Sequence, residues 1–113
     1  MHELSIAQAL VEQVQSIATR ENAKITAITV SLGTLSGVDA DALDQAFKII
    51  VEDTSLMNSR LEISKIPARI VCHSCNRESS PEFPFFACLH CGSLNFEISA
   101  GRDMLLQSVE LEM

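Results

Sequence analysis

The motifs CHSC at residues 72–75 and CLHC at residues 88–91 contain all four cysteines of the chain, with twelve residues between them. Two residues between paired cysteines allow a tight turn to direct both sulfurs at one ion, so two such turns predict a tetrathiolate metal site. Two disulfides, or four unconnected buried thiols, are the alternatives without a metal. Four thiolates fill a tetrahedron and leave no position for water, so we expect a structural zinc site held by Cys72, Cys75, Cys88 and Cys91.

Two other features bear on the identity and the ligands of this metal. Cys91 is followed by Gly92, as in rubredoxin-like centres, which keeps iron as an alternative to zinc. His73 and His90 lie inside the two motifs and compete as ligands. A thiolate is the better donor for zinc, so we expect both imidazoles to hydrogen-bond beside the site or to face solvent.

Composition and charge restrict the classes of protein. A chain of 113 residues, 47% of them apolar, can build one modest core and a small metal-stabilised module. Only eight Lys and Arg face fifteen Asp and Glu, giving a net charge of −7, so we expect no binding to nucleic acid. The sequence has no uninterrupted apolar stretch of membrane-spanning length and no leader-like start, so we expect a cytoplasmic protein without a membrane anchor.

Apolar residues at three- and four-residue steps predict two helices. The first covers about residues 4–20, and Ser5 and Gln8 have the spacing of a capping box at its start. The second begins at an N-cap provided by Asp39 or Asp41 and ends near Asp53.

Alternating apolar residues predict three strands. The first covers about residues 27–32, and the second runs over residues 60–70 with a bend near Lys65 and Pro67. The third closes the chain, and its expected buried face consists of Leu105, Val109, Leu111 and Met113.

The order of these segments predicts an α+β fold. The cysteine module does not need the last strand, so we place that strand back in the first sheet. The expected architecture is two helices packed on a three-stranded sheet, with an inserted small zinc-ribbon-like domain. The first unit is discontinuous, over residues 1–70 and 100–113, and the zinc-binding domain covers residues 71–99. We expect the phenylalanines of the inserted domain to form its core rather than an exposed patch for a partner: Phe83, Phe85, Phe86 and Phe96.

No catalytic motif occurs along the chain. The sequence lacks a Gly-rich phosphate loop, a GxSxG elbow and a helical HExxH motif, so we expect that the protein is not an enzyme.

His2 is the third histidine of the chain, and it has its own chemistry. An α-amino group, the amide nitrogen of residue 2 and the imidazole of residue 2 can close adjacent chelate rings on one ion. Nitrogen-rich planar ligand sets suit Ni(II) or Cu(II) far better than zinc. The alternative is that His2 is part of a frayed terminus without a ligand.

Several short stretches together resemble the HypA/HybF family of hydrogenase nickel metallochaperones. They are MHE at residues 1–3, LSIAQAL at 4–10, VSLG at 30–33, LSGVD at 35–39, the paired cysteine motifs, and GRDMLLQSVELE at 101–112. The resemblance extends over the whole chain. Paired cysteine motifs alone occur in many zinc proteins, so a zinc-ribbon adaptor without nickel transfer is the alternative function.

The resemblance implies two metal sites with separate ligands. His2 would be the central Ni(II) ligand, assisted by the amino terminus of Met1 and the amides of residues 2 and 3, with Glu3 and Asp39 nearby. The unit formed by residues 1–70 and 100–113 would then be the nickel-binding domain. The four cysteines would hold structural Zn(II).

The resemblance also implies partners. Members of the family deliver nickel to the large subunit of [NiFe]-hydrogenase together with the GTPase HypB, and in some organisms they also serve urease maturation. We therefore expect a nickel metallochaperone that acts in the cytoplasm as a monomer or a weak homodimer.

Overall fold

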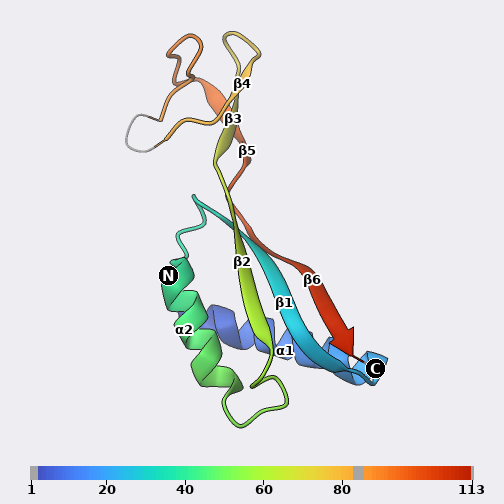
Figure 1. The fold of residues 1–113 in the computed structure, drawn as a ribbon. Coiled ribbons are helices and arrows are strands. Elements are labelled where there is room, and N and C mark those ends of the chain that lie inside the picture. The colour runs from blue at the N-terminus through green and yellow to red at the C-terminus, as the bar shows by residue number, and fades with distance from the viewer. Residues whose placement is uncertain (1–2, 83–85, 113) are drawn as a thin grey trace.

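The computed structural model describes residues 3–82 and 86–112, and over these residues the chain forms two helices and six strands (Figure 1). The helices are α1 (Glu3–Glu21) and α2 (Ala40–Val51). The strands are β1 (Lys24–Gly33), β2 (Arg60–Ile66), β3 (Arg69–Cys72), β4 (Glu78–Ser79), β5 (Phe96–Ala100) and β6 (Met104–Glu112). No helix among the described residues is long and apolar enough to cross a membrane.

The strands of the larger sheet have the order β2-β1-β6. β1 is the central strand, and it runs parallel to β2 and antiparallel to β6. Ile28 of β1 pairs with Leu61 on one side and with Val109 on the other. Parallel neighbours require a crossover, and α2 provides it between β1 and β2.

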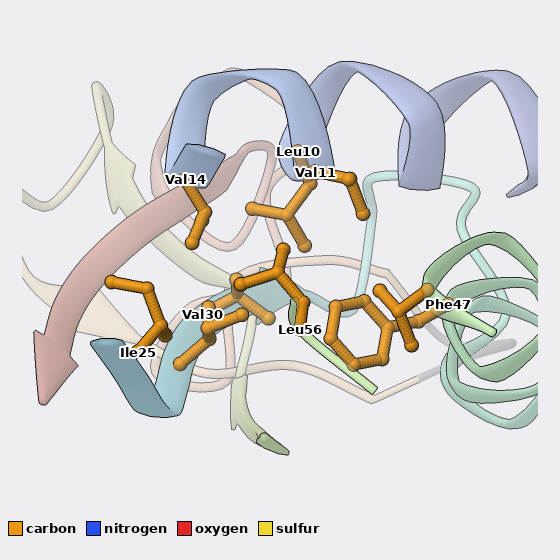
Figure 2. Close-up of a cluster of buried hydrophobic side chains, with 9 residues drawn as sticks. Leu10, Val11, Val14, Ile25, Val30, Phe47 and Leu56 are labelled. Carbon is orange, nitrogen blue, oxygen red and sulfur yellow. The ribbon is translucent and has the colours of Figure 1, made fainter. Parts of the chain in front are cut away.

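The main core lies between this sheet and the two helices (Figure 2). Leu10, Val11 and Val14 of α1 face Ile25 and Val30 of β1, with Leu56 and Phe47 alongside (Figure 2). Full burial of each such side chain is worth about 1.5–3 kcal/mol, so this layer supplies most of the stability of the larger unit. A second cluster, formed by Ala7, Leu43 and Ala46, joins α1 to α2.

The smaller sheet has the strand order β4-β3-β5 and belongs to the module that carries the cysteines. The chain enters this module from β2 and returns from β5 to β6, so the module is inserted between two strands of the larger sheet. It extends away from the helices (Figure 1), and the molecule measures 52 × 24 × 16 Å. Its radius of gyration is 17.4 Å, whereas a compact domain of this length has about 13 Å.

A narrow waist joins the two sheets, and glycines make its close packing possible. A Cβ on Gly33 would lie 2.2 Å from the carbonyl oxygen of Gly101. Gly101 has a φ of 93°, and a Cβ on it would lie 2.7 Å from the Cα of Ala68. The amide of Gly33 donates to the carbonyl of Asp103 at 2.9 Å, and the amide of Leu35 donates to the carbonyl of Gly101 at 2.8 Å. The entry into the module and the exit from it are therefore held against the end of β1.

The predicted α+β class is confirmed, with two helices, a three-stranded larger sheet and an inserted cysteine module. The sequence predicts Asp39 or Asp41 as the N-cap of the second helix, and in the structure Asp39 is the N-cap of α2. The expected capping box at Ser5 is wrong, because α1 already includes Glu3.

The predicted strand over residues 60–70 is two strands. β2 ends at Ile66, and β3 begins at Arg69 in the other sheet. The proline at position 67 lacks an amide hydrogen for a sheet, and Ala68 packs against Gly101 at the waist. The bend expected near Pro67 is thus a change of sheet.

The predicted buried face of the last strand is partly wrong. Leu105 is 56% exposed, whereas Met104, Leu106 and Val109 pack on the main core. The reason is a β-bulge: Thr29 pairs with Ser108 and Val30 with Leu106, so Gln107 is an extra residue that reverses the alternation. Leu111 pairs with buried Ile25 but is 39% exposed at the end of this edge strand, and Met113 lies outside the described residues.

Alanine substitutions of two glycines test the packing at the waist. Gly101 and Gly37 both have a positive φ, of 93° and 78°, but a Cβ on Gly37 would meet nothing within 4 Å. We expect Gly101→Ala to lower the free energy of unfolding by about 1–3 kcal/mol more than Gly37→Ala, because only the former adds a steric clash to the backbone cost. Chemical denaturation followed by circular dichroism measures the difference, and equal losses in the two variants would contradict the close packing.

Candidate metal centre

The first cysteine motif forms a turn at the end of β3. Cys72 is the last residue of this strand, is fully buried and pairs with Phe96 of β5. The amide of Asn76 donates to the carbonyl of Cys72 at 2.9 Å, and the amide of Cys72 donates to the carbonyl of Arg77 at 3.0 Å. These two bonds close the turn and bring Cys75 to the same side as Cys72.

The second motif repeats the same turn without a strand before it. Gly92 donates to the carbonyl of Cys88 at 2.8 Å, and Cys88 donates to the carbonyl of Ser93 at 3.0 Å. The residue after the second cysteine is left-handed in both turns, with φ of 60° at Asn76 and 74° at Gly92. Asparagine and glycine are the residues that adopt this conformation most readily, which explains their presence at these two positions.

Each turn also donates an amide hydrogen to its first sulfur. The amide of Ser74 lies 3.3 Å from the Sγ of Cys72, and the amide of His90 lies 3.4 Å from the Sγ of Cys88. Such bonds stabilise a thiolate, which is the form that binds a metal.

The four sulfurs converge on one point. The Sγ atoms of Cys72 and Cys91 lie 3.6 Å apart, those of Cys75 and Cys88 lie 3.7 Å apart, and all four lie within 4.8 Å of one another. A zinc–sulfur bond of about 2.3 Å in a tetrahedron requires sulfurs about 3.8 Å apart. The residues present therefore fit a tetrathiolate-bound zinc ion.

A small hydrophobic core supports the cluster. Cys72 and Cys88 are buried with Ile70, and Phe86 and Phe96 pack against them. The two rings meet edge to face, with centroids 5.5 Å apart. The expected aromatic core is confirmed for these two residues, whereas Phe83 and Phe85 lie outside the described residues.

Both imidazoles of the motifs have partners away from the sulfurs. The Nε2 of His90 lies 3.1 Å from the carbonyl oxygen of Glu78, and the Nε2 of His73 lies 3.9 Å from a carboxylate oxygen of Glu97. Among the described residues, the grouped metal-ligand atoms are the four sulfurs. Cysteine spacing alone could not reveal one contact of the centre: the hydroxyls of Ser74 and Ser93 lie 3.0 Å apart and join the two turns.

The thiols differ in acidity in the absence of a metal. The amide of Cys75, with that of Ser74, lowers the pKa of Cys72 to about 6, and the amide of Cys91 lowers the pKa of Cys88. The amide of Ser93 acts to lower the pKa of Cys91, but the neighbouring sulfurs, that of Cys72 foremost, outweigh it and raise this pKa to about 12. The pKa of Cys75 is also raised, because burial and the neighbouring sulfurs outweigh the amide of Arg77.

Two of the four residues expected at the nickel site can be placed in the structure. Met1 and His2 are outside the described residues. Glu3 is the first residue of α1, and Asp39 is exposed and accepts a hydrogen bond from the amide of Ala42 at 3.1 Å as the N-cap of α2.

Comparisons with known proteins agree over the whole chain. Residues 1–111 match the family described as "Hydrogenase/urease nickel incorporation, metallochaperone, hypA". The hydrogenase maturation factor HypA of Aquifex aeolicus is 42% identical over 116 residues, which cover 100% of this chain and 99% of that protein. HypA of Synechococcus elongatus is 40% identical over 98% of this chain and 99% of that protein.

Two solved structures have a similar fold. The solution structure of a HypA protein has a TM-score of 0.74 at 27% identity and covers 99% of this chain and 97% of that one. The solution structure of the Ni metallochaperone HypA from Helicobacter pylori has a TM-score of 0.67 at 27% identity, covering 98% and 97%.

Zinc binding to this centre should release protons. Because the pKa of Cys91 is about 12 and that of Cys75 is raised, both thiols are protonated at pH 7.5 in the metal-free protein. We expect at least two protons to leave for each zinc bound, and zinc affinity to fall as the pH is lowered. Calorimetric titration in buffers of different ionisation enthalpy measures the number of protons, and a heat that is independent of the buffer would contradict the assignment.

Proposed function

The chain belongs to the HypA family of hydrogenase/urease nickel-incorporation metallochaperones, and from this premise we propose that it binds Ni(II) at its amino terminus and delivers it to a [NiFe]-hydrogenase. The family consists of maturation factors rather than catalytic enzymes. The sequence likewise contains no Gly-rich phosphate loop, GxSxG elbow or helical HExxH motif. The observation that carries the nickel site is the sequence MHE at residues 1–3, whose last residue, Glu3, is the first residue of α1.

The proposed nickel ligands are the amino group of Met1, the amide nitrogens of residues 2 and 3, and the imidazole of His2. These nitrogens form the planar set that Ni(II) prefers. Glu3 is the first residue of α1, so its amide belongs to the helix terminus, where amide hydrogens have no acceptor within the helix. A deprotonated amide at this position can therefore bind a metal without removing a hydrogen bond from α1.

Two carboxylates are proposed to assist, those of Glu3 and Asp39. Ile6, one turn after Glu3, and Val38, next to Asp39, pack against the same small cluster between the helices. Both carboxylates therefore belong to the end of the helix pair where α1 and α2 begin. One oxygen of Asp39 caps α2, which leaves the other available for a cation.

The four cysteines are proposed to hold zinc as a structural ion. A tetrahedron filled by four thiolates supplies no Lewis-acid position for a substrate, so bound zinc would stabilise the fold of the module. Each of the two structural units would then bind one metal, and residues 71–99 would form the zinc-binding domain. Residues 1–70 and 100–113 would form the nickel-binding domain.

The proposed partners are the GTPase HypB and the large subunit of the hydrogenase, in the cytoplasm. Urease maturation is the alternative destination of the nickel, because the matched family is described for both enzymes. An amino terminus exchanges ligands more readily than a closed thiolate cage, which suits a protein that must release its cargo.

The nickel site is tested by His2→Ala in untagged protein. We expect the substitution to abolish nickel binding in calorimetric titration, because it removes the imidazole that closes the chelate rings. Zinc content and the circular dichroism spectrum should be unchanged, since the four sulfurs proposed to hold zinc all belong to the inserted module and His2 is not among the proposed zinc ligands.

Blocking the amino group with an N-terminal tag provides a matched control and should have the same effect as His2→Ala. Nickel uptake at wild-type affinity in either protein would refute the site. A variant of His2 that still supports hydrogenase maturation would favour the zinc-ribbon adaptor instead.

Two substitutions of Asp39 separate its role as a cap from its role as a ligand. Asparagine can cap a helix, so Asp39→Asn should leave stability nearly unchanged, whereas Asp39→Ala should cost about 1 kcal/mol. If the carboxylate assists nickel, both variants should lose about tenfold in nickel affinity. Unchanged nickel affinity in Asp39→Asn would remove this residue from the site.

A further inference from the structure

The four cysteines of the metal centre differ in their exposure to solvent. Cys72 is 0% exposed and Cys88 is 3% exposed, because both pack into the small core with Ile70. Cys75 is half-buried, whereas Cys91 is exposed. A reagent in solution therefore reaches one ligand of the cluster far more readily than the two buried ligands.

The residue after each second cysteine accounts for part of this difference. Gly92 follows Cys91, and a Cβ built on it would meet nothing within 4 Å apart from its two chain neighbours, so this position is open to solvent. Asn76 occupies the equivalent position after Cys75 with nearly the same backbone conformation, and it carries a side chain there.

Exposed thiolates are the ones that small oxidants attack. We propose that Cys91 is a modification site, at which a hydroperoxide oxidises the zinc-bound thiolate and thereby opens the centre, and that Gly92 keeps the path to its sulfur free. The inference rests on the zinc assignment proposed above and goes beyond it.

The thiolate of Cys91 attacks one oxygen of hydrogen peroxide; a sulfur–oxygen bond forms, the oxygen–oxygen bond breaks, and hydroxide leaves. The thiolate of Cys72, whose sulfur lies 3.6 Å from that of Cys91, then attacks the sulfenic acid and displaces a second hydroxide. Two thiolates are oxidised to one disulfide, one peroxide is reduced, and zinc loses two of its four ligands.

The test uses the untagged, zinc-loaded protein and hydrogen peroxide at less than one equivalent. A 1,3-diketone traps sulfenic acid, peptide mass mapping locates the trap, and a chromophoric chelator reports released zinc. We expect at least about fivefold more trapped product on Cys91 than on any other cysteine, because susceptibility follows exposure. Without the trap, peptide mapping under non-reducing conditions should find the Cys72–Cys91 disulfide in proportion to released zinc.

Two variants exchange the residues beside the second cysteines while keeping the left-handed backbone. Gly92→Asn should lower trapping at Cys91 by about threefold, and Asn76→Gly should raise trapping at Cys75 with little effect on Cys91. Both variants must retain one zinc and the wild-type circular dichroism spectrum.

The outcomes distinguish this inference from the zinc assignment. A protein that binds no zinc overturns both. A protein that binds zinc but is trapped first at Cys72, Cys75 or Cys88 overturns only the modification site. Unchanged trapping at Cys91 in Gly92→Asn overturns the role of the open position.

Discussion

The close backbone contact between Gly33 and Gly101 is the constraint on which the arrangement of the molecule depends. Here the end of the central strand packs against the segment that returns from the inserted module. Two hydrogen bonds hold the segments together, from the amide of Gly33 to the carbonyl of Asp103 and from the amide of Leu35 to the carbonyl of Gly101. Any side chain at either position would separate the backbones. Because the entry into the module passes the same point at Ala68, one packed junction sets the direction of the module relative to the helices.

The sequence predicts the parts of the structure that depend on local pattern. Cysteine spacing identifies all four sulfurs of the cluster, and apolar periodicity identifies both helices, because each signal is contained within a few adjacent residues. The errors in the strands come from pairing between distant segments. The bulge at Gln107 exists because its strand must match β1, some 80 residues earlier in the sequence, and nothing near Gln107 indicates it. The contact between the hydroxyls of Ser74 and Ser93 cannot be predicted from local pattern either, because the two residues lie in different turns.

The two proposed metal sites differ in the chemistry of their ligands. In the inserted module, soft thiolates on turns locked by paired hydrogen bonds produce a closed set of ligands. The proposed nickel ligands are nitrogen donors of the first three residues, assisted by the carboxylates of Glu3 and Asp39 at the starts of two helices. A tetrahedron filled by four thiolates would leave none of them free to compete for an ion meant for transfer.

The insertion of the module between β2 and β6 has a consequence for folding. β1 must pair with β6 across more than seventy intervening residues, and the entropy of closing that loop opposes the pairing. If the module folds around a zinc ion, as proposed, the ion ties Cys72 to Cys91 and brings β3 against β5, which shortens the effective loop before the larger sheet closes. The availability of zinc would then change the folding rate of a sheet that contains no cysteine.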